Sequence, residues 1–281
     1  MSRLLQPITL EDWIKKARKS TLSKNPTAPE EIIFKVLALK PEELLQVAPK
    51  IKLSSKKQLK LNNHLGMLLV GRPLAAVVRS TEFYNTKLKV NSKVLAPRAE
   101  SEVLAEFSIS NIPKNSKVIE VGIGSGAIAL SIAKARPDLS LTVSDVSSTA
   151  LRLAKQNRNL NKVPRKQISF VKGSLLRPFS SKDLECSYIV ANLPYLNPRW
   201  EGLKKKNLSF EPYSALYSEN DGLQTIINLL QQVRIKQVLN AKNWVLLEHD
   251  PRQTKQLNQK SQELGFKTTF ISPYCTQIKL K

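Results

Sequence analysis

The sequence contains few of the residues that form disulfide frameworks or metal sites. Among 281 residues there are two cysteines, Cys186 and Cys275, and two histidines, His64 and His249. They match no zinc-binding spacing and offer too few ligands, so we expect no bound metal ion and a reducing compartment. Cys186 stands at the start of an apolar run and is expected to be a small residue of the core.

Long apolar runs are also missing. No stretch approaches the roughly 20 apolar residues that a membrane-spanning helix needs, which argues against a membrane partner. The first ten residues lack the apolar segment of a secretion signal, and the acidic Glu11 and Asp12 follow directly, unlike in a transit peptide. We therefore expect a cytoplasmic protein.

Acidic residues are scarce relative to basic ones. The chain has 45 Lys and Arg against 22 Asp and Glu, a formal net charge of +23. Such an excess indicates an anionic partner, most simply RNA or the RNA-rich ribosome, although generic surface charge explains the same total. The apolar fraction of 41% is sufficient for one large or two unequal domains in a chain of this length.

Residues 1–79 show the periodicity of helices and are expected to form a small helical domain. Thr9 can cap the first helix, and Pro29 and Pro41 each open another helix with acidic residues directly behind them. A fourth helix is expected over residues 58–69.

Residues 80–110 change period and are expected to link two domains as a β-hairpin followed by a helix. An alternating strand is predicted over residues 83–90, followed by a turn at 91–93 and a short second strand at 94–95. The helix is expected over residues 100–109.

Residues 111–281 alternate between strand and helix patterns. This alternation predicts an α/β fold with a mostly parallel sheet and helices on both faces. The expected strands lie at about 118–121, 139–143, 167–171, 187–191, 244–248, 267–271 and 276–280. The expected helices lie at about 127–133, 149–160, 223–239 and 252–264.

A glycine-rich turn follows the first of these strands. Glycine there lets the backbone approach a ligand closely, and the next helix adds unpaired N–H groups. The run lacks the G-x-G-x-x-G spacing of a dinucleotide fold, and the acid before it, Glu120, would repel a pyrophosphate but suits a cationic amine. The turn consists of Gly122, Ile123, Gly124, Ser125 and Gly126.

Asp145 follows the second strand, where a carboxylate can accept hydrogen bonds from both hydroxyls of a ribose. A ribose without a phosphate, beside an acid that faces an amine, indicates S-adenosylmethionine as the cofactor. The alternative is an ordinary tight turn at the glycines, with Asp145 capping the next helix.

The fourth strand leads into Asn192-Leu193-Pro194-Tyr195. In open α/β sheets, ligands bind just beyond the carboxyl ends of strands. Asn192 offers an acceptor and a donor, Pro194 stiffens the backbone, and Tyr195 adds a flat wall with a polar tip. The combination predicts a pocket for a planar NH2 group, with an ordinary turn at the strand exit as the alternative.

Together these motifs resemble those of class I methyltransferases that act on an amino nitrogen. The segments 82–102 and 210–223 are similar, more closely, to the release-factor glutamine methyltransferases, the HemK/PrmC family. The likeness runs from about residue 71 to the end. It implies a Rossmann-like, mostly parallel seven-stranded sheet with a small N-terminal helical domain and a connecting β-hairpin.

The resemblance also implies a reaction, in which S-adenosylmethionine methylates the side-chain amide nitrogen (N5) of the glutamine in the Gly-Gly-Gln motif of peptide chain release factors. Asn192 and the Leu193 carbonyl would each accept one N–H of that amide, and Tyr195 would pack against its plane. Catalysis would then come from orientation and electrostatics. Arg98 and Glu211 belong to segments that flank the substrate or cofactor in the family, or else form a structural ion pair.

Three positions depart from the family pattern. Leu193 replaces a proline, which makes the motif typical of ribosomal RNA adenine dimethyltransferases as well. Ser174, with Leu175 after it, stands where the family has an acid near the adenine, and Ala99 replaces another proline. Two alternatives follow: a nucleic-acid (rRNA) adenine N6-methyltransferase, and a binding module that keeps the fold without turnover.

Overall fold

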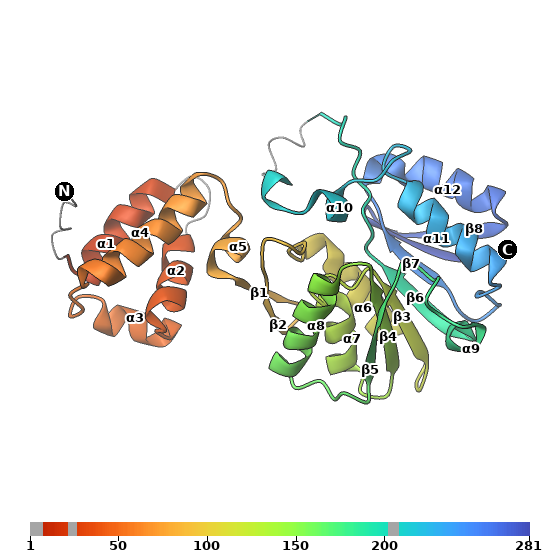
Figure 1. The fold of residues 1–281 in the computed structure, drawn as a ribbon, viewed down its shortest axis with the longest axis horizontal. Coiled ribbons are helices and arrows are strands. Elements are labelled where there is room, and N and C mark those ends of the chain that lie inside the picture. The colour runs from red at the N-terminus through yellow and green to blue at the C-terminus, as the bar shows by residue number, and fades with distance from the viewer. Residues whose placement is uncertain (1–7, 22–26, 202–207) are drawn as a thin grey trace. The chain divides into compact units, whose positions relative to one another are not determined.

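The computed structural model describes residues 8–21, 27–201 and 208–281. The chain divides into two compact units, Met1–Arg79 and Ser80–Lys281 (Figure 1). Within the described ranges, none of the helices has the length and apolar character needed to cross a bilayer.

The first unit has five helices in the part of it that the structure describes. Thr9 caps the first of them, because its Oγ1 accepts the N–H of Asp12 at 3.1 Å, as the sequence predicts. The apolar faces of the helices meet in one core that buries Leu10, Trp13 and Ile33. The helices are α1 (Leu10–Thr21), α2 (Ala28–Leu37), α3 (Pro41–Val47), α4 (Ser55–Leu69) and α5 (Leu74–Val78).

The hairpin that opens the second unit turns earlier than the sequence predicts. Strand β1 (Ser80–Phe83) pairs antiparallel with β2 (Thr86–Lys89). A two-residue turn at Tyr84–Asn85, with φ of 42° and 58°, joins them. The predicted single strand over residues 83–90 and its partner at 94–95 are therefore wrong, because the turn lies inside the alternating run.

The second unit is built on one seven-stranded sheet. Its strands are β3 (Lys117–Val121), β4 (Ser140–Asp145), β5 (Ile168–Lys172), β6 (Ser187–Ala191), β7 (Val245–Glu248), β8 (Phe266–Ser272) and β9 (Cys275–Leu280). Their order is β5-β4-β3-β6-β7-β9-β8, with the first five parallel and β9 antiparallel to both neighbours. The predicted mostly parallel, Rossmann-like sheet is confirmed.

Helices cover both faces of this sheet (Figure 1). They are α6 (Glu102–Asn111), α7 (Ala127–Ala135), α8 (Ser148–Leu160), α11 (Gln224–Ile235) and α12 (Thr254–Glu263). Along β6, Tyr188 and Val190 belong to the core that contains α6, α7 and α8, while Ile189 and Ala191 belong to the core that contains α11 and α12. Side chains alternate across a strand, so burial on both faces explains why this segment is a continuous apolar run.

Several short elements between these were not predicted. They are α9 (Ser181–Leu184), α10 (Tyr213–Leu216) and a 3-10 turn at Leu208–Phe210. Two further 3-10 turns, at Ala99–Ser101 and Pro251–Gln253, overlap the starts of the helices expected over residues 100–109 and 252–264. Cys186 lies between α9 and β6 with a φ of 55° and is exposed. Its predicted place in the core is therefore wrong, because the chain reverses direction there before it enters the sheet.

Candidate active site

Four neighbouring parallel strands end at one edge of the sheet and bring their last residues together. At or just beyond the ends of β4, β3, β6 and β7 stand Asp145, Gly122, Asn192 and Glu248, in that order across the sheet. This edge is where open α/β sheets bind ligands. Residues from distant parts of the chain therefore form one site.

The glycine loop after β3 is held by Asp145. The N–H of Gly124 donates to Asp145 Oδ2 at 3.0 Å, and the N–H of Ser147 donates to Oδ1 at 2.8 Å. Burial raises the pKa of the Asp145 carboxyl, and these backbone donors oppose that rise. Each carboxylate oxygen keeps a further lone pair, so Asp145 can accept two more hydrogen bonds from a ligand.

At two positions of the loop, neighbouring side chains leave room only for glycine. Gly122 has a φ of 78°, and a Cβ there would stand 3.1 Å from Leu193 Cδ2. Gly126 has a φ of 88° at the start of α7, and a Cβ there would stand 2.9 Å from Leu130 Cδ1. Both positions combine a left-handed backbone with little room, which only glycine tolerates without strain.

Glu120 is a buried acid at the base of the loop. Only 2% of its surface is exposed, and its Oε2 accepts the N–H of Ala129 in the first turn of α7 at 2.8 Å. Burial raises the pKa of Glu120 well above the usual range of a carboxyl group. A desolvated carboxylate gains strongly from a cationic partner. Glu120 lines a small cavity together with Arg98, Ser101, Gly122, Ile123, Gly124, Ser125 and Asn192.

Ser174 and Leu175 lie on the β4–β5 side of the site. The N–H of Gly173 donates to the carbonyl oxygen of Asp145 at 3.1 Å, which fixes the start of their turn. Leu175 has a φ of 52°, and its carbonyl accepts from Ser144 Oγ at 3.5 Å. The turn that contains the two residues therefore begins beside Asp145.

Asn192 stands on a wall shared by two cavities, the small one beside Glu120 and a larger one. Its Nδ2 donates to Ser101 Oγ at 2.9 Å. Leu193, the next residue, is buried, and Pro194 is half-buried. The amide of Asn192 thus has its NH2 group bound within the protein, which leaves its carbonyl oxygen as the group to offer a ligand.

Tyr195 is fixed at both ends. Its hydroxyl donates to Glu248 Oε1 at 2.9 Å, and burial raises the pKa of Tyr195, so the hydroxyl stays protonated. Gln253 Nε2 donates to the carbonyl oxygen of Tyr195 at 2.8 Å and to that of Asp221 at 2.7 Å. Gly222, with a φ of 87°, lies against the same Tyr195 carbonyl, and a Cβ at this glycine would stand 2.1 Å from the oxygen.

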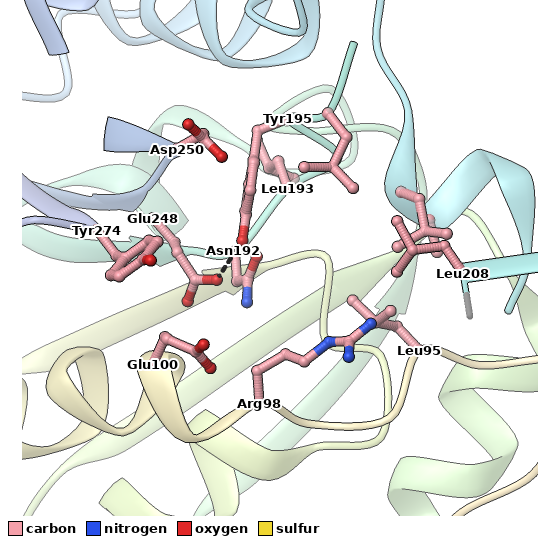
Figure 2. A pocket seen from close by; sticks show the side chains of 13 residues that line it. Leu95, Arg98, Glu100, Asn192, Leu193, Tyr195, Leu208, Glu248, Asp250 and Tyr274 are labelled. Carbon is pink, nitrogen blue, oxygen red and sulfur yellow. Dashed lines mark hydrogen bonds between the residues drawn. The ribbon is translucent and has the colours of Figure 1, made fainter. Parts of the chain in front are cut away.

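The larger cavity has a volume of about 350 Å³ (Figure 2). In Figure 2 the polar ends of Asn192, Tyr195 and Glu248 lie close together, with Arg98 and Glu100 below them. The other lining residues are Leu95, Leu193, Leu196, Leu208, Ala215, Leu216, Asp250 and Tyr274. A leucine-rich wall around convergent polar groups suits a side chain with an aliphatic stem and a hydrogen-bonding end.

Arg98 and Glu211 form an ion pair across the site. Arg98 Nη2 donates to Glu211 Oε2, and the N–H of Ala96 donates to Glu211 Oε1 at 3.4 Å. Burial raises the pKa of the Glu211 carboxyl, while Arg98 opposes the rise. The ion pair links the segment before α6 to the segment before α10. Arg98 also lines both cavities. A contact of either residue with substrate stays a prediction.

Glu248 and Ser101 belong to the site but were missed by the sequence analysis. Glu248 is only 1% exposed and lines the larger cavity. The sequence contains a signal for Glu248, because it is an acid at the end of an apolar strand, as Asp145 is. Ser101 has no such signal, since a serine in front of a helix is most simply interpreted as a cap.

Comparison with known proteins relates the chain to methyltransferases. The family model of the methyltransferase small domain matches residues 98–205. A release factor glutamine methyltransferase of Coxiella burnetii is 32% identical, over 88% of this chain and 87% of its own length. Another, of Neisseria gonorrhoeae, is 34% identical over 73% of each chain.

Solved structures show a likeness in fold. The N-terminal domain of human METTL16, determined in complex with SAH, is similar with a TM-score of 0.50 and 11% identity. The likeness covers 70% of this chain and 77% of that domain. At this identity it concerns the arrangement of the sheet and its helices alone.

Proposed function

Because this chain belongs to the release factor glutamine methyltransferase family, we propose that it methylates N5 of the glutamine in the Gly-Gly-Gln motif of a peptide chain release factor, with S-adenosylmethionine as the donor. The observation that carries the proposal is the position of Asn192, which lines both the cavity beside Glu120 and the larger, leucine-rich cavity. One side chain can therefore hold an amide in the larger cavity next to a methyl donor in the smaller one.

The residues along β3, β4 and β5 fit S-adenosylmethionine. Glu120, whose buried carboxylate forms no ion pair within the described part of the chain, would hold the amine, and Asp145 has lone pairs for the ribose hydroxyls. The loop 122–126 supplies close backbone approach, and Ser174 and Leu175 would border the adenine. When bound, the cofactor supplies an electrophilic methyl group.

The residues after β6 would orient the substrate amide. An amide nitrogen is a poor nucleophile because its lone pair is delocalised into the carbonyl. Asn192 Oδ1 and the Leu193 carbonyl oxygen would each accept one N–H, which fixes the nitrogen with its lone pair toward the donor. Leucine supplies this carbonyl as well as proline does, while Pro194 holds the backbone and Tyr195 packs against the amide plane.

The proposal predicts where a transferred methyl group appears. The full chain is incubated with S-adenosylmethionine radiolabelled in its methyl group and offered a purified release factor or ribosomal RNA. Label is expected on the glutamine of the Gly-Gly-Gln motif, and a release factor with alanine at that glutamine should stay unlabelled. Label in RNA alone would overturn the proposal and favour the adenine N6 alternative, because Asn-Leu-Pro-Tyr also accepts the planar NH2 of an adenine.

We also infer proximity to the ribosome from the net charge of +23, since release factors act there. The cytoplasmic location stays a prediction. The domain boundaries that we propose are 1–79 for a helical domain, 80–110 for a linking hairpin and helix, and 111–281 for the catalytic domain.

Glu120→Gln is expected to weaken S-adenosylmethionine binding about 10- to 100-fold, the effect of losing a hydrogen bond between charged groups. The same change should stabilise the cofactor-free protein at alkaline pH. Because the folded-state pKa of Glu120 is raised, the native chain binds a proton more tightly than the unfolded chain, so stability falls as pH rises through that raised value. Glutamine can still accept from Ala129 but cannot ionise, which removes this decline.

Calorimetric titration with S-adenosylmethionine, and thermal unfolding at pH 5 and pH 8 without it, measure the two effects. Glu106→Gln is the matched control, since Glu106 is an exposed acid on α6. Native cofactor affinity in the Glu120→Gln variant would show that this carboxylate does not hold the amine.

A further inference from the structure

Glu248 is a buried carboxylate next to the residue that holds the substrate amide. The register of β6 and β7 pairs Ala191 with Leu247, so one step further along both strands Asn192 stands beside Glu248. Figure 2 shows the carboxylate between Asn192, Tyr195 and Glu100. Only 1% of Glu248 is exposed, although burying a carboxylate without a cation is unfavourable.

The hydrogen bonds around Glu248 are incomplete. Oε1 accepts from the Tyr195 hydroxyl at 2.9 Å, whereas Oε2 has no partner in hydrogen-bonding geometry among the residues that the structure describes. Ser101 Oγ accepts from Asn192 Nδ2 at 2.9 Å, and its own hydroxyl proton still needs an acceptor. Burial raises the pKa of the Glu248 carboxyl, and Ser101, Tyr195 and Asn192 oppose that rise as hydrogen-bonding side chains. The spare oxygen and the spare proton are therefore neighbours.

An ionised carboxylate can only accept hydrogen bonds, and this sets the direction of its neighbours' bonds. A Ser101 hydroxyl that donates to Glu248 presents only lone pairs to Asn192. The Asn192 amide must then turn its NH2 group toward Ser101 and its oxygen toward the cavity. We propose that Glu248 is a positioning residue which, through Ser101, keeps the Asn192 oxygen directed at the substrate amide.

This inference rests on the proposed function, because it concerns the orientation of an acceptor for an NH2 group. If Asn192 turned over, its own NH2 would face the NH2 of the substrate, and two donors cannot bond to each other. The substrate would then be held by the Leu193 carbonyl alone. Binding of the release factor elsewhere on its surface would survive, so the loss would fall on the transfer step.

Protonation of Glu248 should have the same effect as turning Asn192. A neutral carboxyl group can donate to Ser101, and the direction of the bonds is then no longer fixed. Burial raises the pKa of the Glu248 carboxyl, and the nearby Glu100 raises it further. Transfer should therefore decline on the acid side at a pH above the ordinary range of a glutamate. The charged or titratable groups around the carboxylate are Arg98, Glu100, Tyr195, Asp250, Tyr274 and Cys275.

The test is the Glu248→Gln variant of the full chain, assayed for methylation of a release factor. Glutamine has the same shape but can donate to Ser101. We expect kcat to fall about 10- to 100-fold, as when a reacting group is misplaced, with KM for the release factor and the affinity for S-adenosylmethionine within about 3-fold of native. The acid-side decline in the pH profile of kcat should disappear. An unchanged kcat, or an acid-side decline that persists in the variant, would overturn the proposal.

Ser101→Ala gives a second, independent test of the positioning role. It remains informative if the Glu248→Gln variant does not fold. It removes the link to Asn192 and should lower kcat to a similar extent. Since both changes act through one chain of hydrogen bonds, the double variant should lose no more than about 3-fold beyond either single variant. Fully additive losses would overturn the role of Ser101 as the link. Glu106→Gln serves as the control, and failure of the native protein to label a release factor would instead refute the proposed function.

Discussion

Methyl transfer by the Asn192→Ala variant is expected to be about 100- to 1,000-fold slower than by the native protein, while its affinity for S-adenosylmethionine stays within about 3-fold. In the proposed reaction, the side chain of Asn192 supplies one of the two acceptors for the substrate nitrogen, and the second, the Leu193 carbonyl, belongs to the backbone and survives the change. Single-turnover labelling of a release factor measures the rate, and calorimetry measures the cofactor affinity.

Asn111→Ala is the matched control for this experiment. Asn111 is an exposed amide at the last position of α6, before β3 begins, and its Nδ2 donates to the carbonyl of Phe107 at 2.9 Å. Its loss should leave transfer unchanged. If Asn192→Ala lost cofactor affinity as strongly as it lost transfer, Asn192 would be mainly a cofactor ligand, and the assignment to the substrate amide would be wrong.

Gly222→Ala is expected to destabilise the second unit by about 2–5 kcal/mol, which combines the cost of a left-handed backbone, about 1–2 kcal/mol, with that of overpacking, about 1–3 kcal/mol. A Cβ at this position would stand 2.1 Å from the Tyr195 carbonyl oxygen and 2.6 Å from Gln253 Nε2. Tyr195 must move to make room, so transfer should fall as well. Urea unfolding of the full chain and the labelling assay measure the two losses.

Gly265→Ala separates the two costs. Gly265 has a φ of 83°, close to the 87° of Gly222, but a Cβ there would meet Arg234 only at 3.7 Å, an ordinary contact. Its replacement should cost only the backbone term, about 1–2 kcal/mol, and should leave transfer unchanged. Equal losses of stability in the two variants would mean that the contact between Gly222 and Tyr195 is relieved without strain.

The residues that could be placed from the sequence are those at the ends of buried parallel strands. Glu120, Asp145 and Asn192 could be predicted from local sequence. Each lies in or beside an apolar run that indicates a buried strand, and such strands present ligand groups at their carboxyl ends. The structure gathers them at one edge for that reason. Glu248 obeys the same rule and could have been found with them.

The hairpin could not be placed from periodicity. Tyr84, Thr86, Leu88 and Val90 alternate as if on one face of a single strand, yet a two-residue turn interrupts the run and buries Phe83 beside Thr86 instead. Asparagine at the second turn position favours the left-handed backbone, but tyrosine at the first does not, and no glycine marks the turn.

Contacts between segments that are far apart in the chain could not be predicted from the sequence either. That Ser101 meets Asn192, or that Gly222 lies against Tyr195, depends on how helices and loops return to the sheet. Such pairs have no local signal, and the sequence analysis accordingly missed them. The ion pair between Arg98 and Glu211 could be suggested from the sequence only because both residues lie in segments that resemble the same family.

The strand order has a consequence for the growing chain. Glu248 ends β7, whose outer neighbour in the sheet is β9, and β9 is synthesised after it. Until Cys275–Leu280 pairs with it, β7 is an exposed apolar edge, a template for association with other chains. A truncation before Cys275 would keep Ser101, Asn192 and Glu248 in the chain and yet yield a polypeptide prone to aggregate. The proposed amide-binding site therefore depends on the late pairing of a segment that supplies none of these three residues.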